Sequence, residues 1–164
     1  MYADDNDGQY TPRMDPFWPE RLLSYYLVSN LVFCPNDKLR EVNRSYLVNG
    51  FNDWFKEVLG TNYVTFENHM WPEGMKESAI REPVDTILFG EKAETSHNYH
   101  VDLIRPYPEP PDCYKHIEDG RHNATVKGRG GGANYVFADG GVRYLGFGKA
   151  VNPIILWAVT DAWR

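Results

Sequence analysis

The sequence lacks a long hydrophobic run. Its longest apolar candidate spans residues 154–159, far short of the roughly 20 residues that a membrane-spanning helix needs. The first ten residues are acidic and polar, so they lack the apolar centre of a secretory signal peptide. The chain as given is therefore expected to be soluble. Its abrupt start, in which an acidic turn follows Ala3 at once, suggests a fragment cut after an upstream element.

Clustered basic residues are also scarce. The 17 Lys and Arg residues are outnumbered by 23 Asp and Glu residues, which gives a formal net charge of −6. Non-specific nucleic-acid binding and docking on an anionic membrane both require a basic surface. The small basic run at 127–129 lies among glycines and is typical of a solvated loop. The charge therefore argues against nucleic acid and against a membrane surface as partners.

Cysteine is limited to two residues, Cys34 and Cys113. This number permits one disulfide but does not require it. Cys34 follows the apolar residues 31–33, so a buried free thiol is the alternative to a Cys34–Cys113 bridge.

Aromatic residues, glycine and proline are plentiful instead. Aromatic residues make up 15% of the chain, which also has 14 Gly and 11 Pro. Aromatic side chains suit pleated sheets, and many turn residues leave little room for long helices. A chain of 164 residues without a repeat or an evident linker is the size of one domain. We therefore expect a single α+β or mostly-β domain over residues 1–164, with short helices and long loops.

Local patterns predict individual elements. Helices are expected where apolar residues share one helical face, at 17–27 and at 53–59, the second with Asp53 as its cap. Strands are expected where apolar or β-branched residues form short continuous runs or alternate with other residues. These stretches are 31–34, 44–51, 61–66 and 86–89. Four prolines at 106–111 predict an extended loop, and 154–159 is either a last strand or a short helix.

The clearest local signal is a hairpin. Residues 133–138 and 141–145 flank Asp139-Gly140, a pair typical of a two-residue turn with positive φ at both positions. That turn would set Phe137 opposite Val142 and Tyr135 opposite Tyr144, all on one buried side.

Six segments in order resemble a family of pilin-like proteins, the pseudopilins of type II secretion among them. These segments are Tyr2-Ala3-Asp4-Asp5-Asn6-Asp7-Gly8, Trp18-Pro19-Glu20-Arg21-Leu22-Leu23, Val32-Phe33-Cys34-Pro35-Asn36-Asp37, Arg44-Ser45-Tyr46-Leu47-Val48-Asn49-Gly50, Thr86-Ile87-Leu88-Phe89-Gly90-Glu91, and Arg121-His122 with the later Gly132-Ala133-Asn134-Tyr135-Val136-Phe137-Ala138-Asp139-Gly140. The last one resembles the family's C-terminal signature, in which a His precedes an Asp-Gly hairpin.

The resemblance implies a pilin-like fold, in which a long N-terminal helix packs on an antiparallel sheet. It also implies a non-enzymatic structural subunit of a type IV pilus-like fibre or secretion pseudopilus in the cell envelope. Its partners would be other pilin-like subunits and the secretion machinery. Membrane contact would come only through the apolar N-terminal helix, which this chain lacks.

The chain departs from the family signature between His122 and Asp139. The 16 residues that separate them exceed the family's spacer, and the extra material at 123–129 is expected to be a loop insertion beside flexible glycines. The resemblance makes His122, Asn134, Asp139 and Gly140 a structural signature rather than a catalytic one. Asp139 would set the turn, and His122 and Asn134 would hydrogen-bond the hairpin or a neighbouring loop.

The acidic turn invites a calcium hypothesis. Ca²⁺ takes six to eight oxygen ligands, and the carboxylates of Asp5 and Asp7 alternate before Gly8. Ala3 occupies the first ligand position of that pattern, so a solvated turn is the alternative. Type II secretion pseudopilins carry a structural Ca²⁺ in a C-terminal loop, which adds Asp139 as a ligand candidate, with Glu118 and Asp119 as others.

Three further hypotheses remain beside this one. A zinc site would use the His and Cys residues that recur at short spacing: His97, His100, Cys113, His116 and His122. A Cys34–His122 pair could imitate a nucleophile and its base, but the surroundings of Cys34 do not suggest a reactive thiolate. An extracellular carbohydrate-binding module would need exposed aromatic platforms, for which the candidates are Trp54, Trp71, Trp157 and Trp163.

Overall fold

The computed structural model describes residues 2–40, 42–104, 112–126 and 130–164, with the side chains of 112 and 113 left out. Its centre is a five-stranded sheet of order β3-β1-β2-β4-β5. The strands are β1 (Tyr46–Asn49), β2 (Ile87–Glu91), β3 (His100–Val101), β4 (Gly132–Phe137) and β5 (Val142–Gly146). The α-helices are α1 (Trp18–Arg21), α2 (Leu23–Tyr26), α3 (Asn52–Leu59) and α4 (Tyr63–Glu67).

Short 3-10 helices connect these elements. They are η1 (Asp4–Asn6), η2 (Ser29–Val32), η3 (Gly60–Asn62), η4 (Glu77–Ala79), η5 (Pro83–Asp85) and η6 (Asp112–His116). Within the described residues, no helix is both long enough and apolar enough to cross a membrane. The predicted loop at 106–111 lies outside the described residues, as does 127–129.

The sheet is mixed, whereas the sequence predicted an antiparallel one. β1 pairs antiparallel with β2, and β2, β4 and β5 continue antiparallel. β3 instead runs parallel to β1, with Val48 opposite His100. The last residue of β2, Glu91, lies opposite the first residue of β1, Tyr46. The chain after β2 therefore starts near the first residue of β1. When it pairs with the other edge of β1 as β3, it runs in the same direction as β1. The α+β class is therefore confirmed, and the uniform strand direction was wrong.

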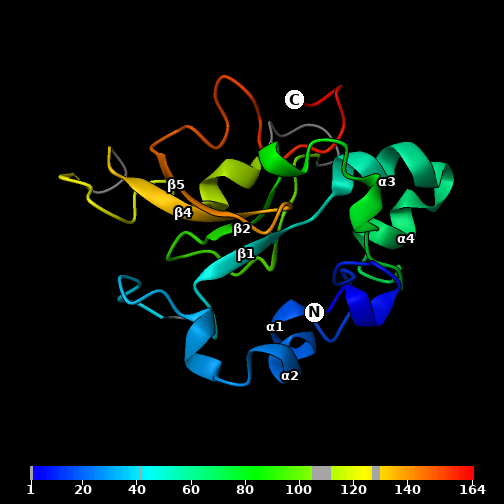
Figure 1. The fold of residues 1–164 in the computed structure, drawn as a ribbon, viewed down its shortest axis with the longest axis horizontal. Coiled ribbons are helices and arrows are strands. Elements are labelled where there is room, and N and C mark those ends of the chain that lie inside the picture. Colours follow the sequence, from blue (N-terminus) through cyan, green and yellow to red (C-terminus); the bar gives the residue numbers. More distant parts are fainter. Residues whose placement is uncertain (1, 41, 105–111, 127–129) are drawn as a thin grey trace.

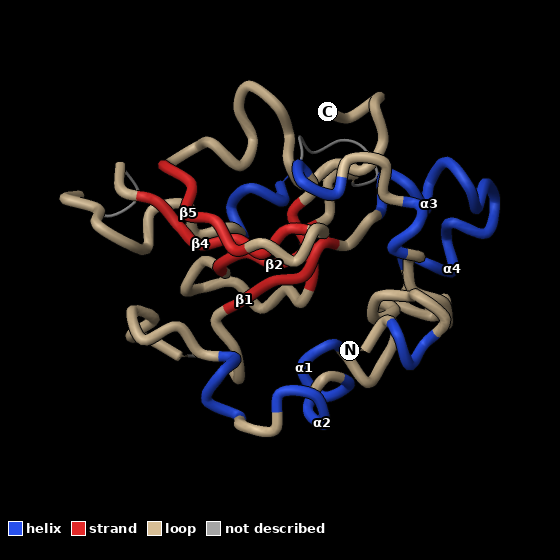
Figure 2. Tube along the Cα trace, in the orientation of Figure 1, coloured by secondary structure: helices blue, strands red, loops and turns tan. Residues whose placement is uncertain are grey.

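The two faces of the sheet are covered by opposite ends of the chain. On one face Leu47, Ile87 and Tyr135 pack with Trp157 of the C-terminal segment. On the other face Val48 packs with Trp18 and Val32 of the N-terminal segment, residues 18–32. In Figures 1 and 2 these segments lie on opposite sides of the sheet, and α3 with α4 closes one end.

A second apolar cluster holds α3 and α4 together. The rings of Phe55 and Phe66 stack with their centroids 4.2 Å apart, and Tyr63 stacks on Phe66 at 5.5 Å. The prediction of a strand at 61–66 was wrong here. Tyr63 and Phe66 are three residues apart and both buried, while Val64 is exposed, which is the spacing of one helix face rather than of a strand.

Other local predictions were met in part. The helix predicted at 17–27 exists as α1 and α2, which are interrupted at Leu22. No strand forms at 31–34, where a strand or an extended piece was predicted. Leu31 and Val32 belong to η2, and Phe33 after it has an extended backbone, with φ −112° and ψ 127°. α3 starts at Asn52 after Phe51, whose φ is 51°, and Asp53 does not cap it. Residues 154–159 form turns, bends and irregular backbone, neither strand nor helix, and the Leu156 carbonyl accepts from the Ile87 N–H of β2 at 2.8 Å.

The hairpin is present with a longer connection than expected. Four residues, 138–141, lie between β4 and β5. The Phe137 N–H donates to the Gly141 carbonyl at 2.8 Å, so the loop proper has three residues, 138–140, of which only Gly140 has a positive φ, 81°. The longer loop shifts the register by one residue, so Tyr135 pairs with Arg143 and Val136 with Val142. Tyr135 and Phe137 are buried as predicted. Val142 and Tyr144 lie on the opposite, exposed face, so that part of the prediction was wrong.

A pair of reciprocal hydrogen bonds precedes the hairpin. The His122 N–H donates to the Gly132 carbonyl, and the Gly132 N–H donates back to the His122 carbonyl, both at 2.9 Å. This pair holds residue 122 beside the first residue of β4.

Candidate functional site

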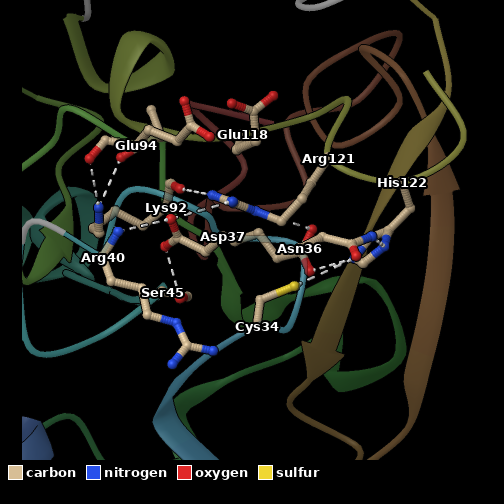
Figure 3. A network of polar contacts seen from close by, with 12 residues as sticks. Cys34, Asn36, Asp37, Arg40, Ser45, Lys92, Glu94, Glu118, Arg121 and His122 are labelled. Carbon is tan, nitrogen blue, oxygen red and sulfur yellow. Dashed lines mark hydrogen bonds and ion pairs between the residues drawn. The ribbon is translucent and has the colours of Figure 1, made fainter. Parts of the chain in front are cut away.

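Three segments that are distant in the sequence meet at the side chain of His122. Nε2 of His122 lies 2.6 Å from Oε1 of Glu91, the last residue of β2, and 3.8 Å from Sγ of Cys34. The ligand-type atoms of Cys34, Glu91 and His122 all lie within 4.8 Å of one another. Figure 3 shows the Cys34 and His122 side chains pointing toward each other. We call these three residues the Cys-Glu-His cluster.

The other imidazole nitrogen is also engaged. Nδ1 of His122 lies 3.0 Å from Nδ2 of Asn36, in the loop after Cys34. An amide nitrogen only donates, so in this arrangement Nδ1 accepts and the ring proton lies on Nε2, facing Glu91. The ring is thus held from both of its nitrogens.

Arg121 and Asp37 support the cluster from beside it. Nη1 of Arg121 lies 3.7 Å from Oδ1 of Asp37, and its Nε lies 3.9 Å from Oε2 of Glu91. The Ser45 hydroxyl donates to Oδ2 of Asp37 at 2.7 Å, as Figure 3 shows. Arg121 also donates to the Lys92 carbonyl. A buried guanidinium therefore compensates the buried carboxylates.

The cluster is largely removed from water. Cys34 is 2% exposed and Glu91 is 1% exposed, whereas the His122 side chain keeps 21% of its surface open. Burial raises the pKa of the Cys34 thiol, and the charge of Glu91 raises it further, against a lowering by a backbone hydrogen bond of Asn36 and by Arg121. A protonated, enclosed thiol is a poor nucleophile. The arrangement favours a structural or metal-binding role over covalent catalysis.

Sequence reasoning considered Cys34 with His122 but missed the role of Glu91. A signal was available, because Cys34, Glu91 and His122 each lie in one of the segments that carry the pilin-like resemblance. Asn36, Asp37 and Arg121 lie in the same segments. Three of the six segments therefore contribute to one site in space.

The remaining signature residues lie along the hairpin. Oδ1 of Asp139 accepts from the Gly141 N–H at 2.9 Å, and its Oδ2 pairs with Arg143. These contacts are those of a residue that sets a turn. Asn134, within β4, is exposed and borders the groove described below.

The calcium candidates lie in two different places. Asp5 belongs to η1 and accepts a hydrogen bond from the Tyr25 hydroxyl at 3.0 Å. Asp7 is exposed at the end of η1, with a φ of 53°. Asp139 is at the hairpin turn, engaged as described above. Among the described residues, the only group of three or more potential metal-binding side chains is the Cys-Glu-His cluster.

The residues of the predicted zinc constellation are also dispersed. His97 is exposed, and His100 is buried against His69 and Phe17. His122 belongs to the Cys-Glu-His cluster instead. The Cys113 side chain lies outside the described residues, and Cys34 is a free thiol, so the Cys34–Cys113 bridge that the sequence permitted is not formed.

The candidate sugar-stacking tryptophans do not form an exposed platform. Trp157 is completely buried, and Trp54 and Trp71 are half-buried against the second apolar cluster. Of the four, only Trp163 is an exposed side chain, at 37%.

An apolar groove opens between the N-terminal segment and the sheet. It has a volume of about 320 Å³. Its walls are mainly aromatic and aliphatic side chains, among them Trp18, Tyr26, Leu31, Phe89, Val136 and Val142. Two of these, Leu31 at 63% and Val142 at 68%, are among the most exposed large apolar side chains of the described residues. One sheet face is thus only partly covered.

No family model, no curated protein and no solved structure matches this chain. The likeness to pilin-like proteins therefore rests on the sequence segments alone. What the structure adds is the α+β architecture, the Cys-Glu-His cluster and the apolar groove.

Proposed function

We propose that this chain is a structural subunit of a type IV pilus-like fibre or a type II secretion pseudopilus, which acts by assembly and not by catalysis. The observation that carries the proposal is the apolar groove on the partly covered sheet face. In the fold that the sequence resemblance implies, a long apolar helix packs on one face of the sheet. The groove offers a place for such a helix.

The chemistry of the groove fits this occupant. Apolar helices are recognised by hydrophobic grooves that receive side chains spaced three and four residues apart. Leu31 and Val142 are exposed and line the groove together with other apolar side chains, and contiguous apolar patches of this kind mark interaction sites. The occupant we propose is the apolar N-terminal helix of a pilin-like subunit.

The proposal includes the cellular setting. Such a subunit would reside in the cell envelope, contact the membrane only through the apolar helix, and assemble with other pilin-like subunits and the secretion machinery. Ca²⁺ at the acidic turn of Asp5 and Asp7 remains part of the proposal. The net charge of −6 is consistent with the absence of nucleic-acid partners.

The test is incorporation into surface fibres in cells that produce the protein. Fibres sheared from the cell surface should contain the chain by immunoblot and by immunogold microscopy. Val142→Arg places a charge in the groove and should strongly reduce the amount in the sheared fraction, because a buried unpaired charge opposes helix docking.

A matched control is available on α4. Val64 is 60% exposed and lies outside the groove, so Val64→Arg should leave incorporation unchanged. The proposal fails if the unmodified chain is absent from sheared fibres, or if both substitutions have the same effect although both variants fold.

A further inference from the structure

We propose that Cys34, Glu91 and His122 form a zinc-binding site. The three residue types are those that hold Zn²⁺ in proteins: a thiolate, an imidazole nitrogen and a carboxylate oxygen. They belong to three separate segments, and Cys34 and His122 are 88 positions apart. This site does not depend on the fibre function proposed above.

The distances fit a metal with little adjustment. Zinc bonds to these donors are about 2.0–2.3 Å long, so tetrahedral ligand atoms lie roughly 3.3–3.7 Å from one another. The distance between Sγ of Cys34 and Nε2 of His122 is 3.8 Å. The distance from Nε2 to Oε1 of Glu91, 2.6 Å, is that of a hydrogen bond. Replacing its proton by zinc requires the pair to separate by less than about 1 Å.

The electrostatic balance also favours a dication. A Cys34 thiolate and the Glu91 carboxylate together carry two negative charges, which Zn²⁺ neutralises. Arg121 and Asp37 form an ion pair that is neutral by itself. Oε2 of Glu91 is buried and makes no hydrogen bond among the described residues, since Nε of Arg121 lies 3.9 Å away. A buried carboxylate oxygen without a hydrogen bond is costly, and a metal ion bound to this carboxylate would offset that cost.

The second nitrogen of His122 already has a suitable neighbour. A metal-bound histidine commonly donates its other ring N–H to a carbonyl or carboxylate oxygen. The amide of Asn36 lies 3.0 Å from Nδ1. Rotation of this amide by half a turn would place its oxygen against an Nδ1 proton while Nε2 binds the metal.

One coordination position remains for a further donor. Cys34 and Glu91 are almost fully buried, so the partly open side of His122 is where water can reach the metal. Zinc with three protein ligands takes a water or an exogenous donor as its fourth ligand.

The experiment uses Co²⁺ as a spectroscopic substitute for Zn²⁺. The whole chain, reduced and freed of metal with a chelator, should bind one equivalent of Co²⁺ and develop a thiolate-to-cobalt charge-transfer band with the visible bands of tetrahedral cobalt. Zn²⁺ should abolish these bands by displacement and should raise the thermal unfolding midpoint. Ca²⁺ should leave the cobalt bands unchanged.

Substitutions then assign the ligands. Cys34→Ser should remove the charge-transfer band, and His122→Ala and Glu91→Gln should each weaken Zn²⁺ binding. The matched controls Cys113→Ser and His97→Ala change the other cysteine and an exposed histidine, and both should keep the parent spectrum. Asn36→Leu, at an exposed position, should weaken Zn²⁺ binding by about 10–100-fold without removing a ligand.

Circular dichroism of each variant distinguishes loss of the metal site from loss of the fold. If a variant at buried Cys34 or Glu91 does not fold, the exposed Asn36→Leu variant still tests the site. The proposal is overturned if the unmodified, reduced chain binds no Co²⁺. It is equally overturned if the charge-transfer band survives in folded Cys34→Ser or disappears in Cys113→Ser.

Discussion

Asp53 shows how one buried carboxylate can connect two elements. It is fully buried in α3, and its Oδ2 accepts from the backbone N–H groups of Val159 at 2.7 Å and Thr160 at 2.9 Å. Burial raises the pKa of Asp53, and the hydrogen bonds from Thr160 and Val159 act in the opposite direction. The side chain therefore fastens the C-terminal segment to the helix.

Asp53→Ala should lower the free energy of unfolding by about 3 kcal/mol, because the buried N–H of Val159 and the half-buried N–H of Thr160 both lose their acceptor. Urea titration followed by circular dichroism measures this change. Glu57→Ala, an exposed position of the same helix, should change the value by less than about 0.5 kcal/mol. Equal effects of the two substitutions would show that the Asp53 contacts do not stabilise the fold.

Two neighbouring histidines, the buried His100 and the half-buried His69, should make stability depend on pH. Burial lowers the pKa of His100 well below its ordinary value of 6.5, and the charge of Arg13 lowers it further. The other charged groups around His100 are Asp102, His69 and Arg44. Burial and Arg13 also lower the pKa of His69, whose Nε2 accepts from Arg13 at 3.2 Å. Folding therefore disfavours the protonated form of both rings.

The unfolded chain protonates these histidines near pH 6.5, while the folded chain does so only at lower pH. The unfolded state thus binds more protons in this window, so stability is full above it and falls as the pH drops through it. For His100 the slope should approach about 1.4 kcal/mol per pH unit, the limit for one proton, and His69 should add to it in the same direction. Urea titrations at a series of pH values measure it.

His100→Gln removes one of these groups and should reduce the slope. His97→Gln, at an exposed position, should leave the slope unchanged. An unchanged slope in folded His100→Gln would assign the acid sensitivity to other groups.

At the scale of elements, the hairpin shows what local sequence can and cannot predict. The Asp139-Gly140 pair marked its position, and the side chain of Asp139 indeed contacts the turn through the Gly141 N–H. The number of loop residues was not predictable from that pair, because turns of two and three residues use similar sequences. One extra loop residue reversed the faces of Val142 and Tyr144.

Gly140→Val should destabilise the hairpin. Gly140 has a φ of 81°, and a Cβ added there meets no atom within 4 Å, so the cost is conformational and not steric crowding by neighbours. We expect a loss of about 1–2 kcal/mol in urea titrations. Gly140→Asn is the control, because Asn tolerates this conformation and should lose much less. Equal losses would contradict the assigned conformation.

For the whole molecule, the C-terminal segment forms one of the layers around the sheet. Trp157 is completely buried, with its ring edge-on to Tyr135 at a centroid distance of 6.1 Å. Gly90 permits this contact, since a Cβ at that position would lie 2.7 Å from the Trp157 ring. The segment has no regular secondary structure, so its packing role was not evident from periodicity.

Trp157→Ala should lower the free energy of unfolding by about 4 kcal/mol, because it opens a large cavity between the sheet and its cover. Trp163→Ala is the matched control. It lies in the same segment with 37% exposure and should cost less than about 1 kcal/mol. Thermal and urea denaturation of both variants provide the comparison. Similar losses of unfolding free energy would show that Trp157 is not the main contact between the C-terminal segment and the sheet.

The Cys-Glu-His cluster was the least predictable feature, because its residues are far apart in the sequence. Glu91 and His122 are 31 positions apart, and Cys34 and His122 are 88 apart. Only the order of the strands brings these positions together. Local patterns contain no information on that order, so the sequence predicted hydrogen bonds of His122 to the hairpin or a neighbouring loop and no role for Glu91.

The reciprocal hydrogen bonds between His122 and Gly132 fix the start of the hairpin. Its position therefore does not depend on the length of chain between these two residues. Because the chain leaves and returns at the same point, added length there does not move β4, and each doubling of a flexible loop costs only about 0.6 kcal/mol. This position is therefore suited to an inserted epitope tag. Over evolution it is also where chains of this architecture can diverge in length while their strands keep the same register.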